Sequence, residues 1–294
     1  MTPGETRASQ HNDYLKAIGL MVVGFSLVPG MDAIAKYLTG ELSVFQLAWA
    51  RFVFHFMFVF PVVWWRHRQE LWPRRPGLQL ARGTLQLAAT LLFFAAIAHV
   101  PIADALALLF VYPLIVTALS PVLLGEHVRR SQWLAIVVGL AGVLLILRPG
   151  TGAFHWAGTF ALAASVCFAL YMIITRKVAG TSPPLVTLVY SAPVGATVLT
   201  LGAPWFWTPP RPSHWALMIL MGLLAACGHF AIVKAFELAP ASRIAPFGYV
   251  EIVAATALGY VIFGDLPDAW TFVGIGVICA AGVLVTYRAP REPI

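Results

Sequence analysis

The stretch Pro240–Asp265, PASRIAPFGYVEIVAATALGYVIFGD, resembles a segment nearer the N-terminus of the same chain, Pro101–Glu126, PIADALALLFVYPLIVTALSPVLLGE. The two stretches lie 139 residues apart. Matched pairs at this offset are Val111 and Val250, Thr117–Leu119 and Thr256–Leu258, Gly125 and Gly264, Glu126 and Asp265, and, further upstream, Gly19 and Gly158, Ser26 and Ser165, and Gly83 and Gly222. Because a constant offset over most of a half-chain is hard to obtain by chance, the chain consists of two copies of one unit.

The composition is that of a membrane protein. Of the 294 residues, 60% are hydrophobic and only 11% are charged, and the mean hydropathy is +0.83, whereas soluble domains contain roughly 25% charged residues. The net charge of +7 is carried by short basic segments between apolar runs, which indicates membrane orientation rather than nucleic-acid binding. Cys167, Cys227 and Cys279 lie in apolar runs without CxxC spacing, so we expect small buried hydrophobic residues rather than metal ligands or disulfides.

Ten apolar runs are long enough to cross a bilayer, which takes roughly 17–25 helical residues. They lie at about 14–38, 43–65, 78–99, 101–124, 131–148, 155–177, 184–203, 213–238, 241–263 and 269–287. The predicted organisation is a cytoplasmic tail at 1–13, a first five-helix repeat at 14–150, a second at 151–288 and a cytoplasmic tail at 289–294. The predicted fold class is an all-α integral membrane protein with ten transmembrane helices.

The distribution of Lys and Arg predicts the orientation. One side of the predicted helices holds thirteen of these residues and the other only three, Lys36, Arg148 and Arg211. By the positive-inside rule both termini are cytoplasmic. Since each repeat has an odd number of helices, the second copy enters the membrane from the opposite face. Such inverted repeats are typical of secondary transporters, whose binding sites lie near the midplane between the repeats.

The two segments Pro101–Glu126 and Pro240–Asp265, with the glycine-dotted helices that contain Gly139, Gly142 and Gly282, resemble the drug/metabolite transporter superfamily, in particular its ten-helix EamA-type members. The resemblance covers nearly the whole chain. It implies a metabolite carrier, commonly an exporter, with a central cavity between the halves and no bound cofactor. The YddG-like amino-acid exporter branch is the one the overall pattern favours, and the nucleotide-sugar and phosphosugar branches remain as alternatives.

Glu251 is the first candidate for the site. It lies about ten residues into its apolar run, about 15 Å along a helix, and ionisable groups at such a depth are costly and often functional. We expect either a proton site or an acceptor for a substrate amine, with a structural carboxylate tied to Arg51 as the alternative. Tyr249 is its neighbour on the helix.

Other polar residues at membrane depth complete the predicted cavity. Arg51 and His55, and Gln86 and Thr90, form i, i+4 pairs that share a helix face. Arg51 is expected to attract a carboxylate or phosphate, or to serve as a structural partner of Glu251. At the repeat offset the matched positions are Thr90 and His229, Tyr112 and Glu251, Tyr190 and Arg51, Tyr171 and Asp32, and Ser165 and Ser26. If the pseudo-two-fold axis passes through a cavity, these partners face it from opposite sides.

Two further charged pairs and two small-residue pairs are assigned structural roles. Asp32 with Lys36, and Lys234 with Glu237, are expected to form local ion pairs near the helix ends. The small-residue pairs Ala135 and Gly139, and Gly276 and Ala280, are expected to pack the fifth and tenth helices against their own bundle, which favours a monomer.

The sequence lacks the motifs of several common classes of enzyme and pump. The sequence contains no HExxH, GxSxG or P-loop, so neither a familiar hydrolase nor an ATP-driven pump is expected. We predict an inner-membrane secondary transporter that exports a small polar metabolite, with an amino acid as the first candidate and protons as a candidate coupling ion. The alternatives are a phosphorylated-sugar carrier, for which Arg51 is the only convincing cation, and a channel-like facilitator or a scaffold without a transport cycle.

Overall fold

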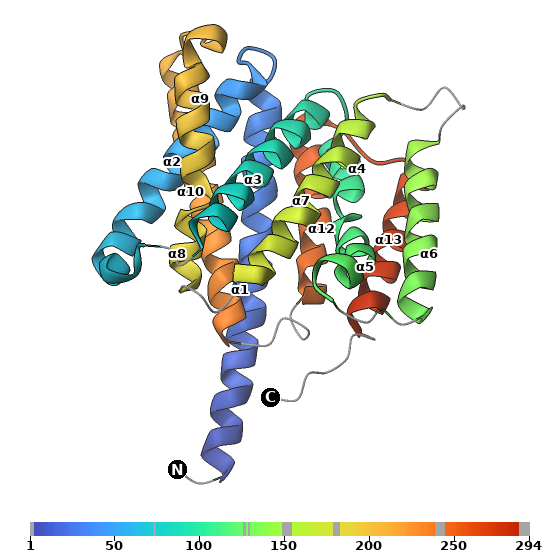
Figure 1. Cartoon of the computed structure of the whole chain (residues 1–294). Coiled ribbons are helices and arrows are strands. Elements are labelled where there is room, and N and C mark those ends of the chain that lie inside the picture. The colour runs from blue at the N-terminus through green and yellow to red at the C-terminus, as the bar shows by residue number, and fades with distance from the viewer. Residues whose placement is uncertain are drawn as a thin grey trace.

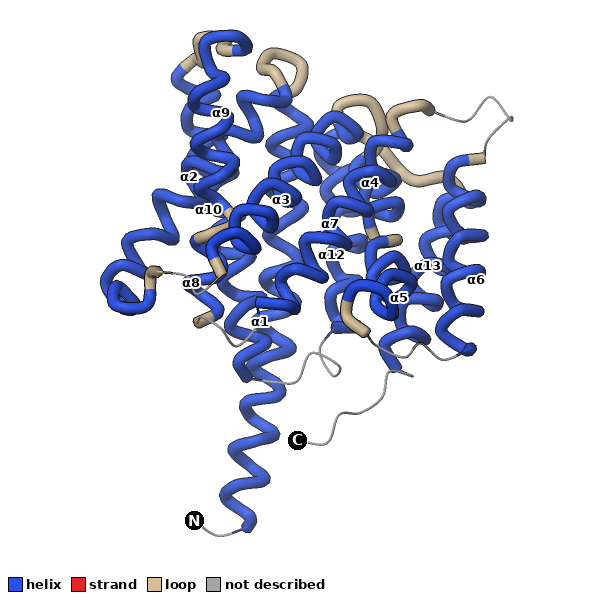
Figure 2. The backbone as a smooth tube through the Cα atoms, viewed as in Figure 1, coloured by secondary structure: helices blue, strands red, loops and turns tan. Residues whose placement is uncertain are grey.

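The computed structural model describes residues 3–72, 75–125, 128, 130–148, 155–178, 183–238 and 245–287. Within these ranges the chain is helical, with turns and short loops at the ends of the bundle (Figure 2). The repeat residues Glu126 and Pro240 and the predicted tail at 289–294 lie outside the described part.

Ten apolar helical spans are present in the described ranges. Seven are long and apolar enough to cross a membrane, and three are shorter. The elements are α1 Pro3–Leu38, α2 Val44–His67, η1 Arg68–Glu70, α3 Pro76–Ile97, α4 Ile102–Leu109, α5 Tyr112–Leu123, α6 Arg130–Leu147, α7 Gly158–Val178, α8 Pro184–Val189, α9 Ala192–Phe206, α10 Pro212–Leu238, η2 Ala245–Tyr249, α12 Val250–Leu258, the π-helical turn η3 Gly259–Phe263, and α13 Ala269–Tyr287 (Figure 1). The prediction of ten helices in two repeats is confirmed.

The N-terminal segment differs from the prediction in one respect. The segment 3–13, assigned to a tail, continues α1 as helix, with Pro3 in the first helical position, where its missing N–H is no loss. In Figure 1 the start of α1 and the end of α13 lie at the same end of the bundle, the lower end in that view.

Three spans are interrupted along their length. The fourth span bends between α4 and α5 at Phe110, and the seventh bends between α8 and α9 at Tyr190. In both, a proline follows within three residues, Pro113 and Pro193, in the first turn of the next helix, where it cannot donate to the preceding turn. The ninth span changes from 3₁₀ to α helix at Tyr249. Broken helices at membrane depth are tolerated where they line a cavity or are buried in protein.

The packing follows the repeat symmetry. The first helix of each repeat packs on the third helix of the other, as α1 on α10 and α7 on α3. Equivalent spans also meet directly, in the pairs α2–α9, α4–α12 and α6–α13. The aromatic rings of Phe110 and Tyr249, which are equivalent at the repeat offset, lie 5.4 Å apart. The two interrupted spans that carry them therefore meet at the pseudo-two-fold axis.

Glycines bring α6 and α13 into close contact. A Cβ atom on Gly142 would lie 3.0 Å from the carbonyl oxygen of Gly274, and one on Gly274 would lie 2.8 Å from the carbonyl oxygen of Gly142. Gly139 also packs closely, against Leu114. The expectation for Gly276 was wrong, because a Cβ there would meet nothing within 4 Å. Gly274, two residues earlier, is the position at which the helix crossing requires glycine.

We therefore expect Gly274→Ala to destabilise the protein and Gly276→Ala to leave it unchanged. The added methyl group at Gly274 collides with backbone as well as with Ile146, and overpacking of this kind costs about 1–3 kcal/mol. Both positions lie in α13, so the helix propensity gained is the same. Thermal unfolding in detergent, followed by intrinsic fluorescence, measures the difference. Equal melting temperatures for the two variants would contradict the close crossing.

Candidate functional site

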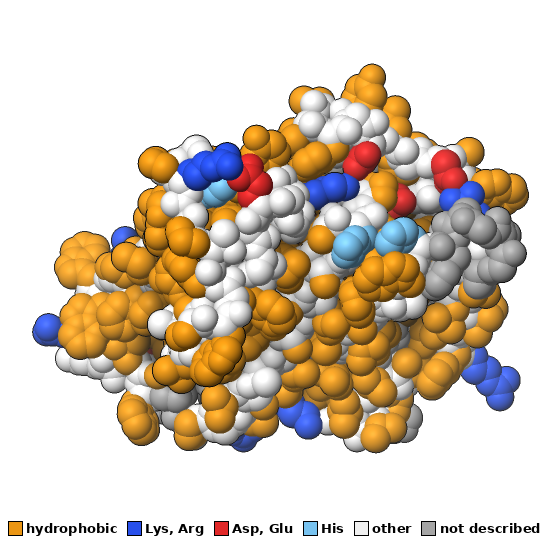
Figure 3. Space-filling model, turned by 90° about the horizontal axis from the view of Figure 1, so that it is seen from above, with side chains coloured by type: hydrophobic (Ala, Val, Ile, Leu, Met, Phe, Trp, Pro, Cys, Tyr) orange, Lys and Arg blue, Asp and Glu red, His pale blue; other side chains and the backbone are white. Residues whose placement is uncertain are grey.

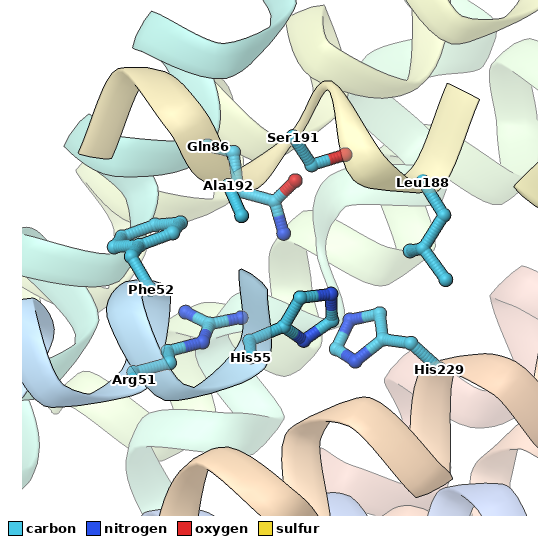
Figure 4. Close-up of a pocket in the computed structure, with 8 residues that line it drawn as sticks. All are labelled: Arg51, Phe52, His55, Gln86, Leu188, Ser191, Ala192 and His229. Carbon is cyan, nitrogen blue, oxygen red and sulfur yellow. The ribbon is translucent and has the colours of Figure 1, made fainter. Parts of the chain in front are cut away.

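A small pocket lies where α2, α3, α10 and the break between α8 and α9 converge (Figure 4). It is lined by Arg51, Phe52, His55, Gln86, Leu188, Ser191, Ala192 and His229. Its volume is about 10 Å³, roughly the space of one water molecule. In this conformation the site has no room for a metabolite.

Arg51 is the central cation of the site. One of its Nη atoms donates a hydrogen bond to Thr90 Oγ1, and that hydroxyl in turn donates to the Gln86 carbonyl oxygen at 2.9 Å. The guanidinium also lies 5.4 Å from the centre of the Phe52 ring, a favourable cation–π distance. Two carboxyl groups, Asp32 and Glu251, interact electrostatically with it. Among the described residues, neither lies within ion-pair distance of Arg51, so the predicted direct Arg51–Glu251 pair is absent.

Two histidines, one from each repeat, face each other across the pocket. The rings of His55 and His229 lie 5.6 Å apart and nearly perpendicular (Figure 4). His229 Nδ1 is 2.8 Å from the Ala225 carbonyl oxygen, so this nitrogen carries the hydrogen. Within the described part of the chain, His55 Nε2 and Gln86 Oε1 are buried and have no hydrogen-bond partner. Buried polar atoms are nearly always paired, and these two atoms therefore mark groups that a ligand or water would bind.

The carboxylate of Glu251 lies beside the interrupted spans. Glu251 is in the first turn of α12, directly after the break, and is 8% exposed. It interacts electrostatically with Tyr112, the residue that opens α5. The rings of Tyr112, Phe168 and Tyr171 form a continuous series. The ring centres of Tyr112 and Phe168 lie 4.8 Å apart, and those of Phe168 and Tyr171 lie 5.4 Å apart. The series connects the breaks near the pseudo-two-fold axis to the network around Arg82.

Asp32 is part of this interior, which corrects the expectation of a local pair near the headgroups. Its side chain is buried, at 2% exposure, and interacts electrostatically with Arg51 and Glu251. Lys36 instead pairs with Asp265 at 2.8 Å. The lysine stem is long enough to reach the loop after η3, and so the i, i+4 neighbour is left without this cation. The other expected pair, Lys234 and Glu237, lies partly outside the described side chains.

Arg82 is the most completely bonded polar residue near the site, and the sequence interpretation assigned it no role. Nε donates to Thr175, Nη1 to Gln79 and to the Thr187 carbonyl oxygen, and Nη2 to Tyr171 and Ser191, at 2.6–3.1 Å. These bonds use all five N–H groups of a guanidinium. Because Thr187 and Ser191 flank the break between α8 and α9, Arg82 replaces the helical hydrogen bonds lost there.

Comparison with known proteins agrees with this architecture. The sequence matches the EamA-like transporter family over residues 15–148 and again over 155–287. The chain belongs to this family. It is 30% identical to the S-adenosylmethionine uptake transporter of Rickettsia prowazekii (strain Madrid E), over 96% of this chain and 97% of that protein. It is 29% identical to the riboflavin transporter of Vibrio cholerae, over 74% of each chain. A solved crystal structure that is 20% identical has the same fold, with a TM-score of 0.63 over 90% of this chain and 96% of that one.

The upper end of this EamA-family protein is tied together by ion pairs between the repeats. We call the residues Lys36, Glu41, Arg148, Arg211, Asp265 and Asp268 the upper face, seen from above in Figure 3. Lys36 pairs with Asp265 at 2.8 Å, Arg148 with Asp268 at 2.5 Å and Arg211 with Glu41 at 3.2 Å. Each of these pairs joins the first half of the chain to the second. The Thr271 backbone N–H and the Arg148 guanidinium lower the pKa of Asp268, which keeps that carboxylate charged.

The structure brings together most of the predicted EamA-family cavity residues. Arg51, Gln86 and His229 line the pocket, and Thr90 binds Arg51. Glu251 and Tyr171 interact electrostatically with Arg51, and Tyr112 does so with Glu251. Tyr249 packs on Phe110 at the axis.

Two predicted residues have their hydroxyl groups engaged elsewhere. Ser165 Oγ donates to the Leu162 carbonyl oxygen in its own helix at 2.8 Å. Tyr190 OH donates to the Leu71 carbonyl oxygen. Neither lines the pocket.

Sequence reasoning missed Arg82 and the pocket residues at the α8–α9 break, although signals for both were present. Gln79, Arg82, Gln86 and Thr90 recur at helical spacing in the third span, a polar stripe on one face. Ser191 stands two residues before a proline in the middle of an apolar run, the arrangement expected of a broken helix.

Proposed function

We propose that this protein is a secondary transporter that carries a small metabolite with an amino-acid group across the inner membrane by alternating access. The observation that carries the proposal is the small site that contains Arg51 and is lined by residues of both repeats. A site of this kind is unexpected in a scaffold, because buried ionisable groups are costly in a membrane protein unless they serve a function.

The polar groups of the site match the two ends of a zwitterion. Arg51, with Thr90 beside it, is suited to a substrate carboxylate, since a guanidinium binds carboxylates through two parallel hydrogen bonds. Glu251 is suited to the ammonium group. The unpaired His55 Nε2 and Gln86 Oε1 supply further bonds. A phosphorylated sugar fits less well, because Arg82 has all its donors engaged.

The names of the relatives narrow the range of substrates that we propose. S-adenosylmethionine contains an amino-acid group, and the relative named for its uptake aligns over nearly the whole chain. We therefore place S-adenosylmethionine first, neutral and aromatic amino acids second, and riboflavin third. Either direction of net transport is compatible with two interchangeable repeats, and we propose export.

Alternating access requires the upper face to open and close. The inter-repeat ion pairs support a state closed at that end, and the small pocket volume supports a site that must widen to admit a metabolite. The test is transport by the purified protein in lipid vesicles, with radiolabelled S-adenosylmethionine, amino acids and riboflavin, each with and without a proton gradient. Saturable transport of one of them supports the proposal. Failure of the folded protein to move any of them contradicts it.

The orientation is a further proposal, with both termini in the cytoplasm. It predicts that reporter fusions after Arg75 and Arg130 are cytoplasmic and that a fusion after Arg211 is periplasmic. The physical reason is the excess of Lys and Arg, counted from the sequence, on the side of the predicted helices that holds both termini. A paired phosphatase and fluorescent-protein reporter measures each position. Any of the three on the opposite side would contradict the topology.

A further inference from the structure

Lys36 and Asp265 form the least exposed of the Lys and Arg ion pairs described for the upper face. Their charged atoms lie 2.8 Å apart, and the two side chains are 16% and 33% exposed. The ammonium group also donates to the Val100 carbonyl oxygen at 3.1 Å and lies 5.0 Å from the centre of the Phe263 ring. One residue in the last turn of α1 therefore joins the link between α3 and α4 to the loop that follows η3.

The backbone around η3 fixes the position of the Asp265 carboxylate. The π-helical turn ends at Gly264, whose φ of +71° lies in the left-handed region, which glycine adopts without a steric cost. The N–H groups of Gly264 and Asp265 donate back to the carbonyl oxygens of Tyr260 and Gly259, at 3.0 and 3.1 Å. The acid is thus held in place for Lys36 by main-chain hydrogen bonds.

The other repeat has an acid at the equivalent position but no matching cation. At the offset of 139 residues, Asp265 corresponds to Glu126 and Lys36 corresponds to Thr175, a neutral residue. The Thr175 hydroxyl accepts a hydrogen bond from Arg82 Nε at 2.8 Å, so it belongs to the network that supports the break between α8 and α9. The repeat operation therefore does not produce a second copy of this ion pair at the opposite end of the bundle.

We propose that the Lys36–Asp265 pair is a one-sided latch, which holds the upper end closed and makes the state open at that end rare in the empty protein. The proposal rests on the proposed function, because a latch has a role only if the upper end opens during transport. Lys36 belongs to the first repeat and Asp265 to the second, so the pair separates when one repeat moves against the other at that end. A substrate shifts the balance only by as much as its affinity differs between the two states. The latch therefore limits opening, and with it leakage, when no substrate is bound.

The test measures access to the pocket from each side with a reporter cysteine. Ala192 lines the pocket, and Ala192→Cys is introduced into full-length protein whose native Cys167, Cys227 and Cys279 are replaced by alanine. This parent protein is inserted into vesicles in one orientation, without substrate. A membrane-impermeant thiol reagent is applied from the upper side or from the lower side, and the labelling rate is recorded.

Two variants of the parent remove the latch from either partner. We expect Lys36→Gln and Asp265→Asn each to raise the labelling rate from the upper side about tenfold, which corresponds to the loss of one hydrogen bond between charged groups. Lys36→Arg keeps the charge and should label like the parent.

Arg211→Gln is the matched control. Arg211 pairs with Glu41 at 3.2 Å and also joins the two halves of the chain, but its side chain is 71% exposed. Exposed ion pairs contribute little to stability, so we expect this variant to label at the parent's rate from both sides.

The outcomes separate the latch from the proposed function. The latch is overturned, and the transporter proposal stands, if the reporter is labelled from both sides but Lys36→Gln and Asp265→Asn leave the upper-side rate unchanged. An equal rise in Arg211→Gln would also overturn it. Loss of folded protein in both latch variants would make the pair a structural one, with the same consequence. Labelling from one side at most, in every variant and with substrates present, would contradict alternating access and this inference with it.

Discussion

Replacement of Arg82 by Met should abolish folded protein at ordinary growth temperature, the largest single effect that we expect in this chain. The side chain is 2% exposed and donates to five described oxygens. Each buried polar group left without a partner costs about 1–3 kcal/mol. The Thr187 carbonyl oxygen cannot turn away, because it belongs to the end of α8. The total should therefore reach about 4 kcal/mol or more, measured as loss of monodisperse protein in detergent and of thermal stability.

Two further variants make this prediction specific. Tyr171→Phe removes one of the five bonds and keeps the ring against the guanidinium, 4.9 Å away, so we expect a loss of only about 1 kcal/mol. Arg68→Met removes an exposed arginine from η1 and should leave stability unchanged. A stable Arg82→Met protein that fails only in transport would show that Arg82 binds substrate instead of supporting the broken helix.

Replacement of Glu251 by Gln should leave the protein folded and reduce its affinity for substrate about 10- to 100-fold. The amide keeps the shape and hydrogen-bonding capacity of the carboxylate but loses its charge, and hydrogen bonds to charged groups contribute about 1.5–3 kcal/mol. If Glu251 holds the substrate ammonium group, the loss appears with and without a proton gradient. Concentration-dependent uptake into vesicles measures it.

Other results for Glu251→Gln would assign the residue differently. Normal exchange of substrate, with loss of only the gradient-driven accumulation, would make Glu251 a proton carrier. A lower melting temperature with near-normal transport per folded molecule would make it a structural residue and remove it from the site. Thr256→Val is a useful control on the same helix, because its hydroxyl donates to the Ile252 carbonyl oxygen at 2.8 Å and has no part in the proposed site.

The sequence was informative about the fold because membrane helices obey strong local rules. Apolar length predicted each span, and the repeat offset predicted which helices are equivalent; the contacts of α1 with α10 and of α3 with α7 follow that equivalence. The breaks were harder to predict, because a run such as Pro101–Glu126 has the same hydropathy whether its helix is continuous or interrupted. The tertiary environment, here the contact of Phe110 with Tyr249, decides where the interruption lies.

The site was predicted less completely, because long side chains choose partners that are distant in sequence. Lys36 stands four residues after Asp32, which favours a local pair, yet it bonds to Asp265 across the bundle. Asp32 consequently belongs to the interior with Arg51, a role that spacing alone does not indicate. Arg51, Gln86 and His229, which the sequence singled out, do lie together around the pocket, since polar groups at mid-span are rare and stand out against an apolar background.

The central claim is that the site of Arg51, His55 and His229 opens alternately to the two sides of the membrane. The most direct measurement uses the substitution His229→Cys in a protein whose native Cys167, Cys227 and Cys279 are replaced by alanine. This protein is inserted into vesicles in one orientation. A membrane-impermeant thiol reagent is applied from each side, with and without a transported substrate. The account predicts labelling from both sides and a substrate-dependent change in the ratio of the two rates. Labelling from one side only, at a rate that no transported substrate alters, would contradict it.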